Sequence, residues 1–571
     1  MLFFNSITKQ LTQKIDITPK IIDGVVPENL SGHIFIAAPT YDETISSQHR
    51  FAAVGAIVRW DFNDDGQVKV TAKRIATWEN FWRSTFPLHR ISHPFFPAEI
   101  DVIETTELAN MGVVKMGERL IVTADAGRYW EIDPITLDTI SPVGYFDENI
   151  VSQPLSFFPL IANTAKPFFE RDSKQLFSCQ LNTQPQVERY SANLVGIPHI
   201  TAWDGGKDLK HWLIEGTALK GMPHQTIVTH DFVLVPDFPY RMGISVLMGL
   251  SIKQNFSCTD IYIVERLEMT QERQTVSARR ITFDGATHSL LSNYYPIDNK
   301  LFAIAIQQAT IDNLQTIQPG DVIEYNGKAY TKDYYGIPWM FAFAPGVLRK
   351  IVIRAEKLIS EEVFTHPGWF TASFHTADPR ELYSENGYSA IFQVYAGMPR
   401  EFISRRQYQN LRFAPNKVIK SESLPQQDLP SVLAKIPLNL DWNTLTQKIE
   451  SSKLSNPDTF VTTLGKEQLD FFVFPEGHIL GTIQFIPTGT GYIFATVLTD
   501  SGSQAWIFNA QSLNTGAICK IKIPSSVDLG YTMYSEYFSS INKTSTNNYK
   551  IDRIECDRRS ITSVIDDFFK I

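Results

Sequence analysis

The sequence predicts an all-β protein. Short apolar or alternating runs recur at close intervals, turn-forming clusters separate them, and few stretches have a helical period. Many short strands with regular turns indicate a sandwich, a barrel or a propeller. Composition does not choose among these architectures. No clean repeat of fixed period is present to make the choice either.

The predicted strands follow one another along the chain, and each is rich in β-branched or aromatic residues. They include residues 57–62, 68–72, 119–124, 232–235, 261–265, 301–306 and 347–353. Turns are predicted at Asn63-Asp64-Asp65-Gly66, Asp133-Pro134, Asp204-Gly205-Gly206 and Asn326-Gly327.

A few segments break this pattern. Residues 78–100 and 156–169 are aromatic and rich in proline, which is typical of long loops packed over the face of a sheet. Residues 400–412 have the composition of a helix, and residues 421–455 are expected to be a surface excursion before the last strands. The C-terminal tail, residues 541–571, is predicted to end in a short amphipathic helix.

Composition excludes several classes of function. The net charge is -9 and there is no basic stripe, which argues against a nucleic-acid partner. The four cysteines lie far apart and predict reduced thiols. No signal peptide or membrane-spanning run is evident, so we expect a cytoplasmic protein. The signatures G-x-S-x-G, G-x-x-x-x-G-K-(S/T) and G-x-G-x-x-G are absent as well.

Residues 221–237, GMPHQTIVTHDFVLVPD, form the stretch around which the chain is organised. His224 comes shortly before a predicted buried strand, where its side chain would point into a central cavity. Alternatively, His224 is a core histidine bonded to a backbone carbonyl.

A set of short motifs accompanies this stretch in a fixed order. They are ENLSGH at 28–33, VGAIVR at 54–59, LIVTADAGR at 120–128, EIDPITL at 131–137, TDIYIVER at 259–266, THS at 287–289, PEGH at 475–478, QFIP at 484–487 and WIFNA at 506–510. Together with His224-Gln225, this order resembles the carotenoid cleavage oxygenases, a family that includes lignostilbene dioxygenases and retinal-forming enzymes. The resemblance covers about residues 20–540.

This resemblance implies a seven-bladed β-propeller with a dome of loops and short helices over one face, formed by residues 1–571 as a single domain. It also implies non-haem iron, Fe(2+), held by four histidines, and cleavage of a C=C bond with O2. The implied substrate is an apolar polyene, apocarotenoid or stilbene-like molecule. Peripheral contact with a membrane is implied too, and the apolar run 242–252 is a candidate for it, or else a buried segment.

Only two of the four family ligands are histidines here. His224 and His288 match the second and third ligands. The first falls in TAKP at 164–167 and is Lys166, and the fourth falls in GYTMY at 530–534 and is Tyr534. Asp125 stands where relatives carry an acidic residue of the outer shell, which orients ligand rings and balances the metal's charge.

Other histidines are weaker candidates for a replacement ligand, because each also fits a surface or strand-end position. They are His199, His211, His230 and His478. His366 and His375 share one segment without a third partner, so we expect both to be structural.

The two replacements leave three hypotheses open. The chain is an iron-dependent dioxygenase with an altered ligand shell, or a metal-free relative that binds an apolar lipid or polyene without cleaving it. In the metal-free case, the Lys166 ammonium would take the metal's place and donate to His224, His288 and the Tyr534 oxygen. The third hypothesis makes Lys166 a Schiff-base partner for an aldehyde, which needs a desolvated amine.

Overall fold

The protein is described here from a computed structural model. The residues it describes are 15–39, 55–63, 66–77, 90–91, 100–101, 108–145, 148–150, 152–155, 158–188, 191–206, 209–221, 223–238, 258–308, 324–325, 328–329, 345–354, 357–395, 430–451, 469–499, 501–524, 529, 532, 534–543 and 550–551.

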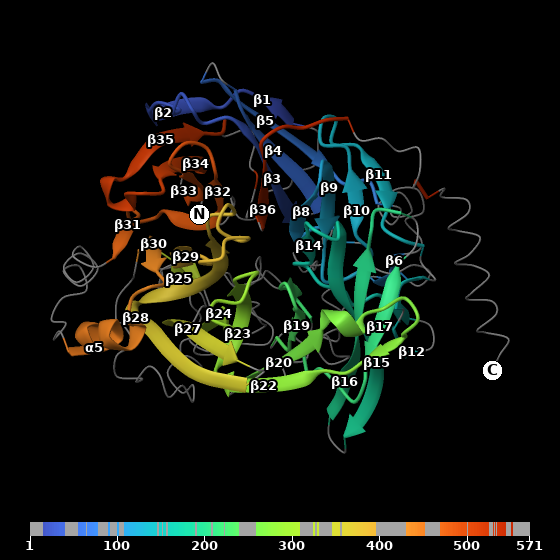
Figure 1. Cartoon of the computed structure of the whole chain (residues 1–571). Coiled ribbons are helices and arrows are strands. Elements are labelled where there is room, and N and C mark those ends of the chain that lie inside the picture. The colour runs from blue at the N-terminus through green and yellow to red at the C-terminus, as the bar shows by residue number, and fades with distance from the viewer. Residues whose placement is uncertain are drawn as a thin grey trace.

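Seven β-sheet blades surround a central axis (Figure 1), which confirms the predicted seven-bladed propeller. Blade 1 contains β36 (Ser535–Phe538), β3 (Gly32–Pro39), β4 (Gly55–Phe62), β5 (Val68–Arg74) and β1 (Ile15–Ile17). Blade 2 contains β8 (Gly112–Met116), β9 (Arg119–Thr123), β10 (Trp130–Ile132) and β11 (Thr139–Pro142). Blade 3 contains β14 (Phe168–Glu170), β15 (Gln175–Glu188), β16 (Ser191–Trp203), β17 (Lys210–Ile214) and β21 (Thr275–Val276).

The remaining blades follow in chain order. Blade 4 contains β18 (Ile227–Val228), β19 (Phe232–Pro236), β20 (Cys258–Glu265) and β22 (Arg279–Asp284). Blade 5 contains β23 (Ala286–Ser292), β24 (Leu301–Gln308), β27 (Pro345–Arg354) and the first part of β28 (Lys357–Thr376). Blade 6 contains the end of β28, β29 (Ala390–Tyr395), β30 (Val432–Pro437) and β31 (Asp470–Val473). Blade 7 contains β32 (Ile479–Ile486), β33 (Tyr492–Thr499), β34 (Gly502–Asn509), β35 (Ala517–Lys522) and β2 (Lys20–Gly24).

The long strand β28 links two blades. Its residues up to Phe370 pair with β27, and its last residues, from Thr371, pair with β29. One continuous strand is therefore the outer strand of blade 5 and the first strand of blade 6. The first strands of the blades lie next to one another around the axis. Each contacts the next in the order β23, β18, β14, β8, β36, β32 and β28.

The ends of the described chain close the ring. Near the N-terminus, β2 joins blade 7 by pairing with β35, whereas the C-terminal strand β36 joins blade 1 by pairing with β3. The two ends thus complete adjacent blades. Packing holds these blades together, since Trp60 on β4 meets Phe494 on β33 edge to face at 5.3 Å between ring centroids.

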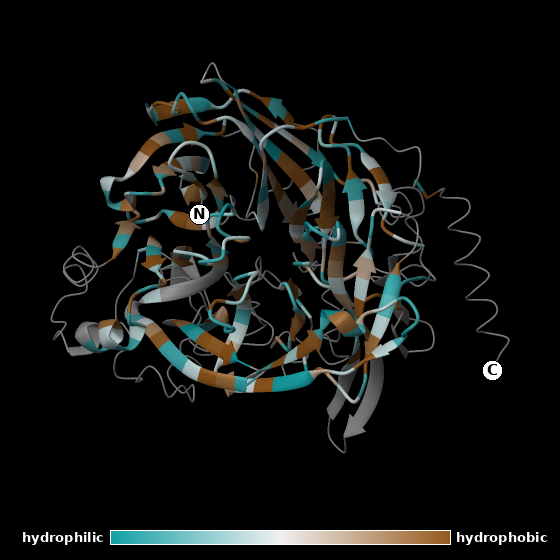
Figure 2. Cartoon of the chain, viewed as in Figure 1, coloured by the Kyte–Doolittle hydropathy of each residue, from teal (hydrophilic) through white to brown (hydrophobic). Residues whose placement is uncertain are grey.

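The core lies between neighbouring sheets, so several inner strands are buried on both faces, and the buried Arg59 and Asp61 on β4 pair with each other. Every residue of β4 and of β33 is buried. At the outer edge of blade 4, β22 alternates instead, with Ile281 and Phe283 buried between exposed neighbours. Figure 2 shows hydrophobic bands along the strands of the propeller, with hydrophilic bands between them.

The sequence predictions for the strands are largely confirmed. The seven predicted runs fall within β4, β5, β9, β19, β20, β24 and β27, although the run at 119–124 extends one residue beyond β9. Cys179, Cys258 and Cys519 are free thiols, while Cys556 lies outside the described residues.

The expected surface excursion at 421–455 is wrong in part. It contains β30, which is mostly buried between β29 and β31, and the helix α5 (Trp442–Ser451). The Asp441 side chain accepts a hydrogen bond from the Thr444 amide and caps this helix, and Trp442 is fully buried. The segment is polar on average, so the short strand β30 did not stand out in the sequence. Its apolar residues are buried only when β29 and β31 pack on either side.

The loops expected at 78–100 and 156–169 lie partly in strands as well. Described pieces are β6 (Arg90–Ile91) and the first residue of β7 (Ile100–Asp101) in one, and β13 (Phe158–Leu160) and most of β14 in the other. Strand β13 pairs with β12 (Ser152–Leu155). The runs 242–252 and 400–412 and most of the tail lie outside the described residues, so the predicted dome and tail helix stay predictions. Among the described helices, none is long and apolar enough to cross a membrane.

Replacing Trp60 by alanine tests the closure between blades 1 and 7. The side chain is fully buried, so its removal should lower the free energy of unfolding by about 3–5 kcal/mol through lost contacts and a residual cavity. Urea denaturation followed by circular dichroism measures the change. As a control, Leu267→Ala removes a side chain that is 90% exposed and should leave stability within about 0.5 kcal/mol.

Candidate functional site

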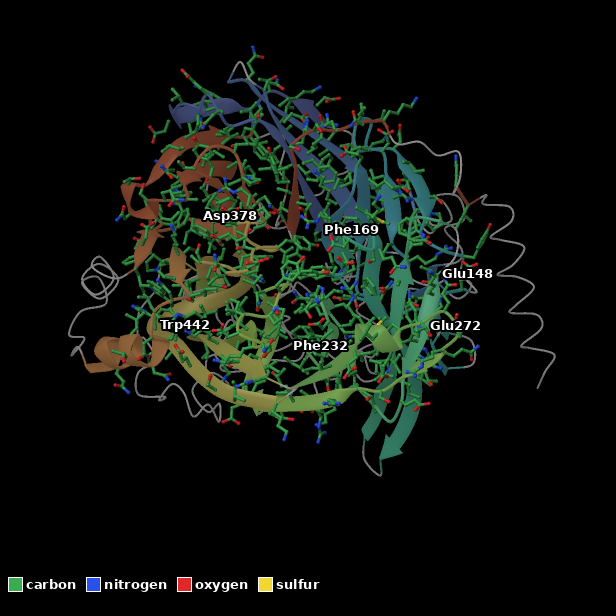
Figure 3. The ribbon with its side chains drawn as sticks, in the orientation of Figure 1. Glu148, Phe169, Phe232, Glu272, Asp378 and Trp442 are labelled. Atoms are coloured by element: carbon green, nitrogen blue, oxygen red, sulfur yellow. The ribbon has the colours of Figure 1, made fainter. Side chains whose placement is uncertain are left out.

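The four positions inherited from the family ligand set lie on four different blades. Lys166 stands just before β14, His224 just before β18 and Tyr534 just before β36, while His288 lies in β23 itself. Because these strands are the first of their blades, their entry ends meet at the axis of the propeller. In Figure 3, Phe169 on β14 lies toward the centre of the propeller, whereas Trp442 at the start of α5 lies near its rim.

His224 is buried and held by Asp125. Its Nδ1 lies 2.9 Å from both carboxylate oxygens of Asp125, which stands between β9 and β10 in blade 2. The Ala165 amide also donates to Asp125, at 3.1 Å. Because a carboxylate accepts, Nδ1 carries the ring proton and Nε2 is left as the acceptor.

The Tyr534 hydroxyl is the hydrogen-bond partner of His224 Nε2. Its oxygen lies 3.0 Å from His224 Nε2, so the phenol donates to the imidazole. Two phenylalanines present edges to the pair: Phe238 lies 6.1 Å from the His224 ring, and Phe374 on β28 lies 5.8 Å from the Tyr534 ring. The described part of the centre therefore combines a hydrogen-bonded chain, Asp125–His224–Tyr534, with an aromatic wall.

Lys166 lies on the face of Tyr534. Its ammonium is 3.7 Å from the ring centroid, a cation–π contact, and it donates to the Ser289 hydroxyl at 3.1 Å. Ser289 in turn donates to Gln225 Oε1 at 3.1 Å. Gln225 is fixed by Leu290, whose amide donates to Oε1 at 2.8 Å and whose carbonyl accepts from Nε2 at 2.7 Å.

The half-buried Lys166 amine has unusual electrostatics. Burial lowers its pKa to about 7, against the opposing pull of the negative charge on Asp125. No carboxylate among the described residues forms an ion pair with it. The amine is therefore far easier to deprotonate than a surface lysine.

His288 completes the group. It is almost fully buried, and burial, with a smaller contribution from nearby His224, lowers its pKa to about 3. The imidazole is therefore neutral at pH 7. Its neighbour on β23, Thr287, accepts a hydrogen bond from the Thr259 hydroxyl, which anchors this end of the strand to blade 4.

These residues do not fit a four-imidazole iron site. The His224 nitrogen that would face a metal accepts the Tyr534 proton, and Lys166 brings a group that is cationic whenever it is protonated. Within the described part of the chain, no group of three or more His, Cys, Asp or Glu side chains is arranged to hold a metal ion. The assignment of His224 and His288 as metal ligands stays a prediction.

The hypothesis for Lys166 needs a correction. The ammonium does lie against Tyr534, but it meets the ring face and not the oxygen, and its hydrogen bond goes to Ser289 and not to the histidines. The reason is geometric, because the phenol oxygen is directed at His224 and the ring face is what remains for Lys166.

The other histidines have local surroundings of their own. His230 bonds Asp231, His478 lies near the Glu476 carbonyl, and His366 stacks on Trp369 at 4.3 Å. His199 and His211 lie on neighbouring strands of blade 3, and burial lowers the pKa of both. His375 pairs with β29 in blade 6. Sequence reasoning gave no role to Ser289 or Gln225, although each directly follows a candidate histidine.

Comparison with known proteins agrees with this architecture. The model of the retinal pigment epithelial membrane protein family matches residues 4–345, which is more than half of the chain. The chain belongs to this family, the carotenoid cleavage oxygenases. Among curated proteins, none matches the sequence.

Solved structures of this carotenoid cleavage oxygenase fold are similar over most of their length. A point mutant of Synechocystis apocarotenoid oxygenase has 14% sequence identity and a TM-score of 0.62, with 94% of this chain and 98% of that chain covered. The cobalt-substituted form of the Synechocystis protein has the same identity and coverage with a TM-score of 0.61. A chimera of that protein with the retinal pigment epithelial protein also gives 0.61, with 14% identity and the same coverage.

Replacing Tyr534 by phenylalanine tests the bond to His224. The variant keeps the ring under Lys166 but leaves the buried imidazole nitrogen without its donor, so the free energy of unfolding should fall by about 1–3 kcal/mol. Denaturation at fixed pH measures the loss. Tyr295→Phe, at a ring that packs on Tyr294 away from this group, is the matched control. Equal stabilities for the two variants would contradict the role given to the Tyr534 hydroxyl.

Lys166 should also give stability a pH dependence. Its folded-state pKa, about 7, lies below the ordinary value of 10.5, so between these values the unfolded chain binds the proton that the folded chain has lost. The free energy of unfolding should therefore rise with pH across this window. In Lys166→Met this contribution disappears. Denaturation at several pH values measures both slopes, with Lys69→Met, at a half-exposed lysine, as the control.

Proposed function

We propose that this family member binds an apolar, polyene-like small molecule at the centre of the propeller without iron-dependent cleavage. The observation that carries the proposal is the 3.0 Å hydrogen bond between the Tyr534 hydroxyl and His224 Nε2. A nitrogen that accepts a proton from a phenol has no lone pair left for a metal. Binding without cleavage is therefore the function that the residues at the centre support best.

The charges at the centre support the same proposal. A metal held by neutral imidazoles leaves its positive charge to be balanced by outer carboxylates. Here, Asp125 faces His224, and the Lys166 amine supplies the positive group on the axis. An amine and a phenol thus fill the space of two imidazoles and organise the centre through hydrogen bonds alone.

The class of ligand follows from the family and from the aromatic wall. The similar solved structures include an enzyme named apocarotenoid oxygenase. Phe238 and Tyr534 pack against His224, and Phe374 packs against Tyr534; aromatic edges and faces suit a conjugated chain. The proposal includes a cytoplasmic location. It also includes peripheral contact with a membrane, because apolar ligands of this class partition into lipid.

One observation favours a second candidate, the iron-dependent dioxygenase. The Asp125–His224 pair has the arrangement in which a carboxylate orients a metal-bound imidazole. In that case, Tyr534 would have to swing away from His224 and Lys166 would have to lose its proton. The cobalt-substituted Synechocystis protein carries a metal in a similar fold, which supports metal binding in this second candidate.

Metal analysis of the purified protein separates the two candidates. We expect far less than one equivalent of iron in the unmodified chain, even after incubation with ferrous iron under anaerobic conditions. The double variant Lys166→His/Tyr534→His restores the two missing imidazoles, so it should bind about one equivalent. Inductively coupled plasma mass spectrometry gives the stoichiometry.

Ligand binding is measured separately in the same preparation. Quenching of tryptophan fluorescence by an unreactive polyene alcohol should be saturable, and oxygen should cause no cleavage product. The variant Lys69→His/Lys73→His carries two new histidines at blade 1 and controls for adventitious metal. Stoichiometric iron together with cleavage of the polyene by the unmodified chain would overturn the proposal in favour of the dioxygenase.

A further inference from the structure

We propose that Lys166 captures the aldehyde end of a conjugated apolar aldehyde as a covalent iminium. This inference rests on the proposed function, because it assumes that a polyene-like chain enters the centre. It adds a reactive group and a ligand class, the polyene aldehyde, to what would otherwise be a noncovalent site.

The first support is the position of the amine. The Lys166 side chain comes from the entry end of β14 and stands among residues from other blades, with Tyr534 of blade 1 below it and Ser289 of blade 5 beside it. It is half-buried, while His224 and His288 are almost fully buried. Lys166 is thus among the residues on the axis that retain some exposed surface.

The second support is the incomplete set of partners. An ammonium has three N–H donors, and among the described residues only Ser289 accepts from Lys166. Other half-buried lysines are better satisfied: Lys350 donates to the carbonyls of Leu438 and Leu440 and pairs with Glu362. Lys166 therefore retains N–H groups that can be exchanged for a bond to carbon without the loss of a protein partner.

The chemistry is balanced without a further reagent. The amine nitrogen attacks the aldehyde carbon and forms a C–N bond, giving a carbinolamine. The carbinolamine then loses its oxygen as water and leaves a C=N bond. Counted from the protonated lysine, one ammonium and one aldehyde give one iminium and one water, so charge is conserved and no oxidant or reductant takes part.

The surroundings suit the product as well as the reactant. The iminium keeps a single positive charge at the place of the ammonium, 3.7 Å from the centre of the Tyr534 ring, so the cation–π contact is retained. The Tyr534 hydroxyl is held by His224 and the Ser289 hydroxyl by Gln225, which keeps both groups fixed during the reaction. Phe374 packs against the Tyr534 ring and keeps the surroundings of the iminium apolar.

Reductive trapping tests the proposal. The full-length protein is incubated with all-trans-retinal, a polyene aldehyde, and reduced with sodium borohydride. The expected product is a chain heavier by the mass of the aldehyde less one oxygen, with the modification on the tryptic peptide that contains Lys166. Before reduction, absorption should shift to longer wavelength, as it does when a polyene imine is protonated.

Three controls sharpen the test. Lys166→Arg keeps the charge but cannot form the imine, so trapping should vanish. Lys115→Arg, at a lysine that also lies over an aromatic ring, 4.9 Å from the Phe538 centroid, should label like the unmodified chain. Peptide mapping of the unmodified protein needs no variant, so the test holds even if Lys166→Arg folds poorly.

The outcomes separate this inference from the proposed function. Saturable binding of retinol without an adduct of retinal at Lys166 overturns the inference and leaves the proposed function standing. Labelling spread evenly over surface lysines overturns the inference as well. If neither retinol nor retinal binds, both the proposed function and this inference are overturned. Stoichiometric labelling at Lys166 supports both.

Discussion

The hydrogen bond from Tyr534 to His224 determines what the centre of this propeller can do. It is one link in a chain that starts at the Asp125 carboxylate, passes through the His224 ring and ends under the Lys166 amine. Because Asp125 fixes the tautomer of the ring, the outward nitrogen must accept, and the phenol is the donor that satisfies it. The nitrogen that would bind iron in a four-histidine relative is used within the protein instead.

The propeller makes this arrangement possible. Lys166, His224, His288 and Tyr534 are separated by tens to hundreds of positions in the chain, yet each belongs to the first strand of a blade or directly precedes it. Blade symmetry brings these equivalent points together on the axis. The closure between blades 1 and 7 matters for the same reason, because Tyr534 precedes β36, the strand by which the C-terminal part of the chain completes blade 1.

Burial gives the substituted residues new properties. Lys166 would be an ordinary cation in water, but in its half-buried place it has a lowered pKa, an aromatic ring as its main neighbour and one hydroxyl as a hydrogen-bond partner. His288 is kept neutral by the same burial. The centre thus presents an amine that contacts a hydroxyl and an aromatic ring, and the proposals of ligand binding and aldehyde capture rest on these contacts.

Much of the fold was determined by the sequence itself. Local runs such as those in β4 and β20 are apolar and β-branched, and these properties act within a strand, so the all-β class and most described strands could be predicted. Order and spacing of short motifs pointed to the family, and motif alignment placed Lys166, His224, His288, Tyr534 and Asp125 at one site. Tertiary structure alone decided which atoms meet: that Tyr534 donates to His224, that Lys166 lies on a ring face, that Ser289 and Gln225 take part, and that β30 is a core strand. These depend on distances between blades, and a linear pattern carries no information about the direction of a side chain across the axis.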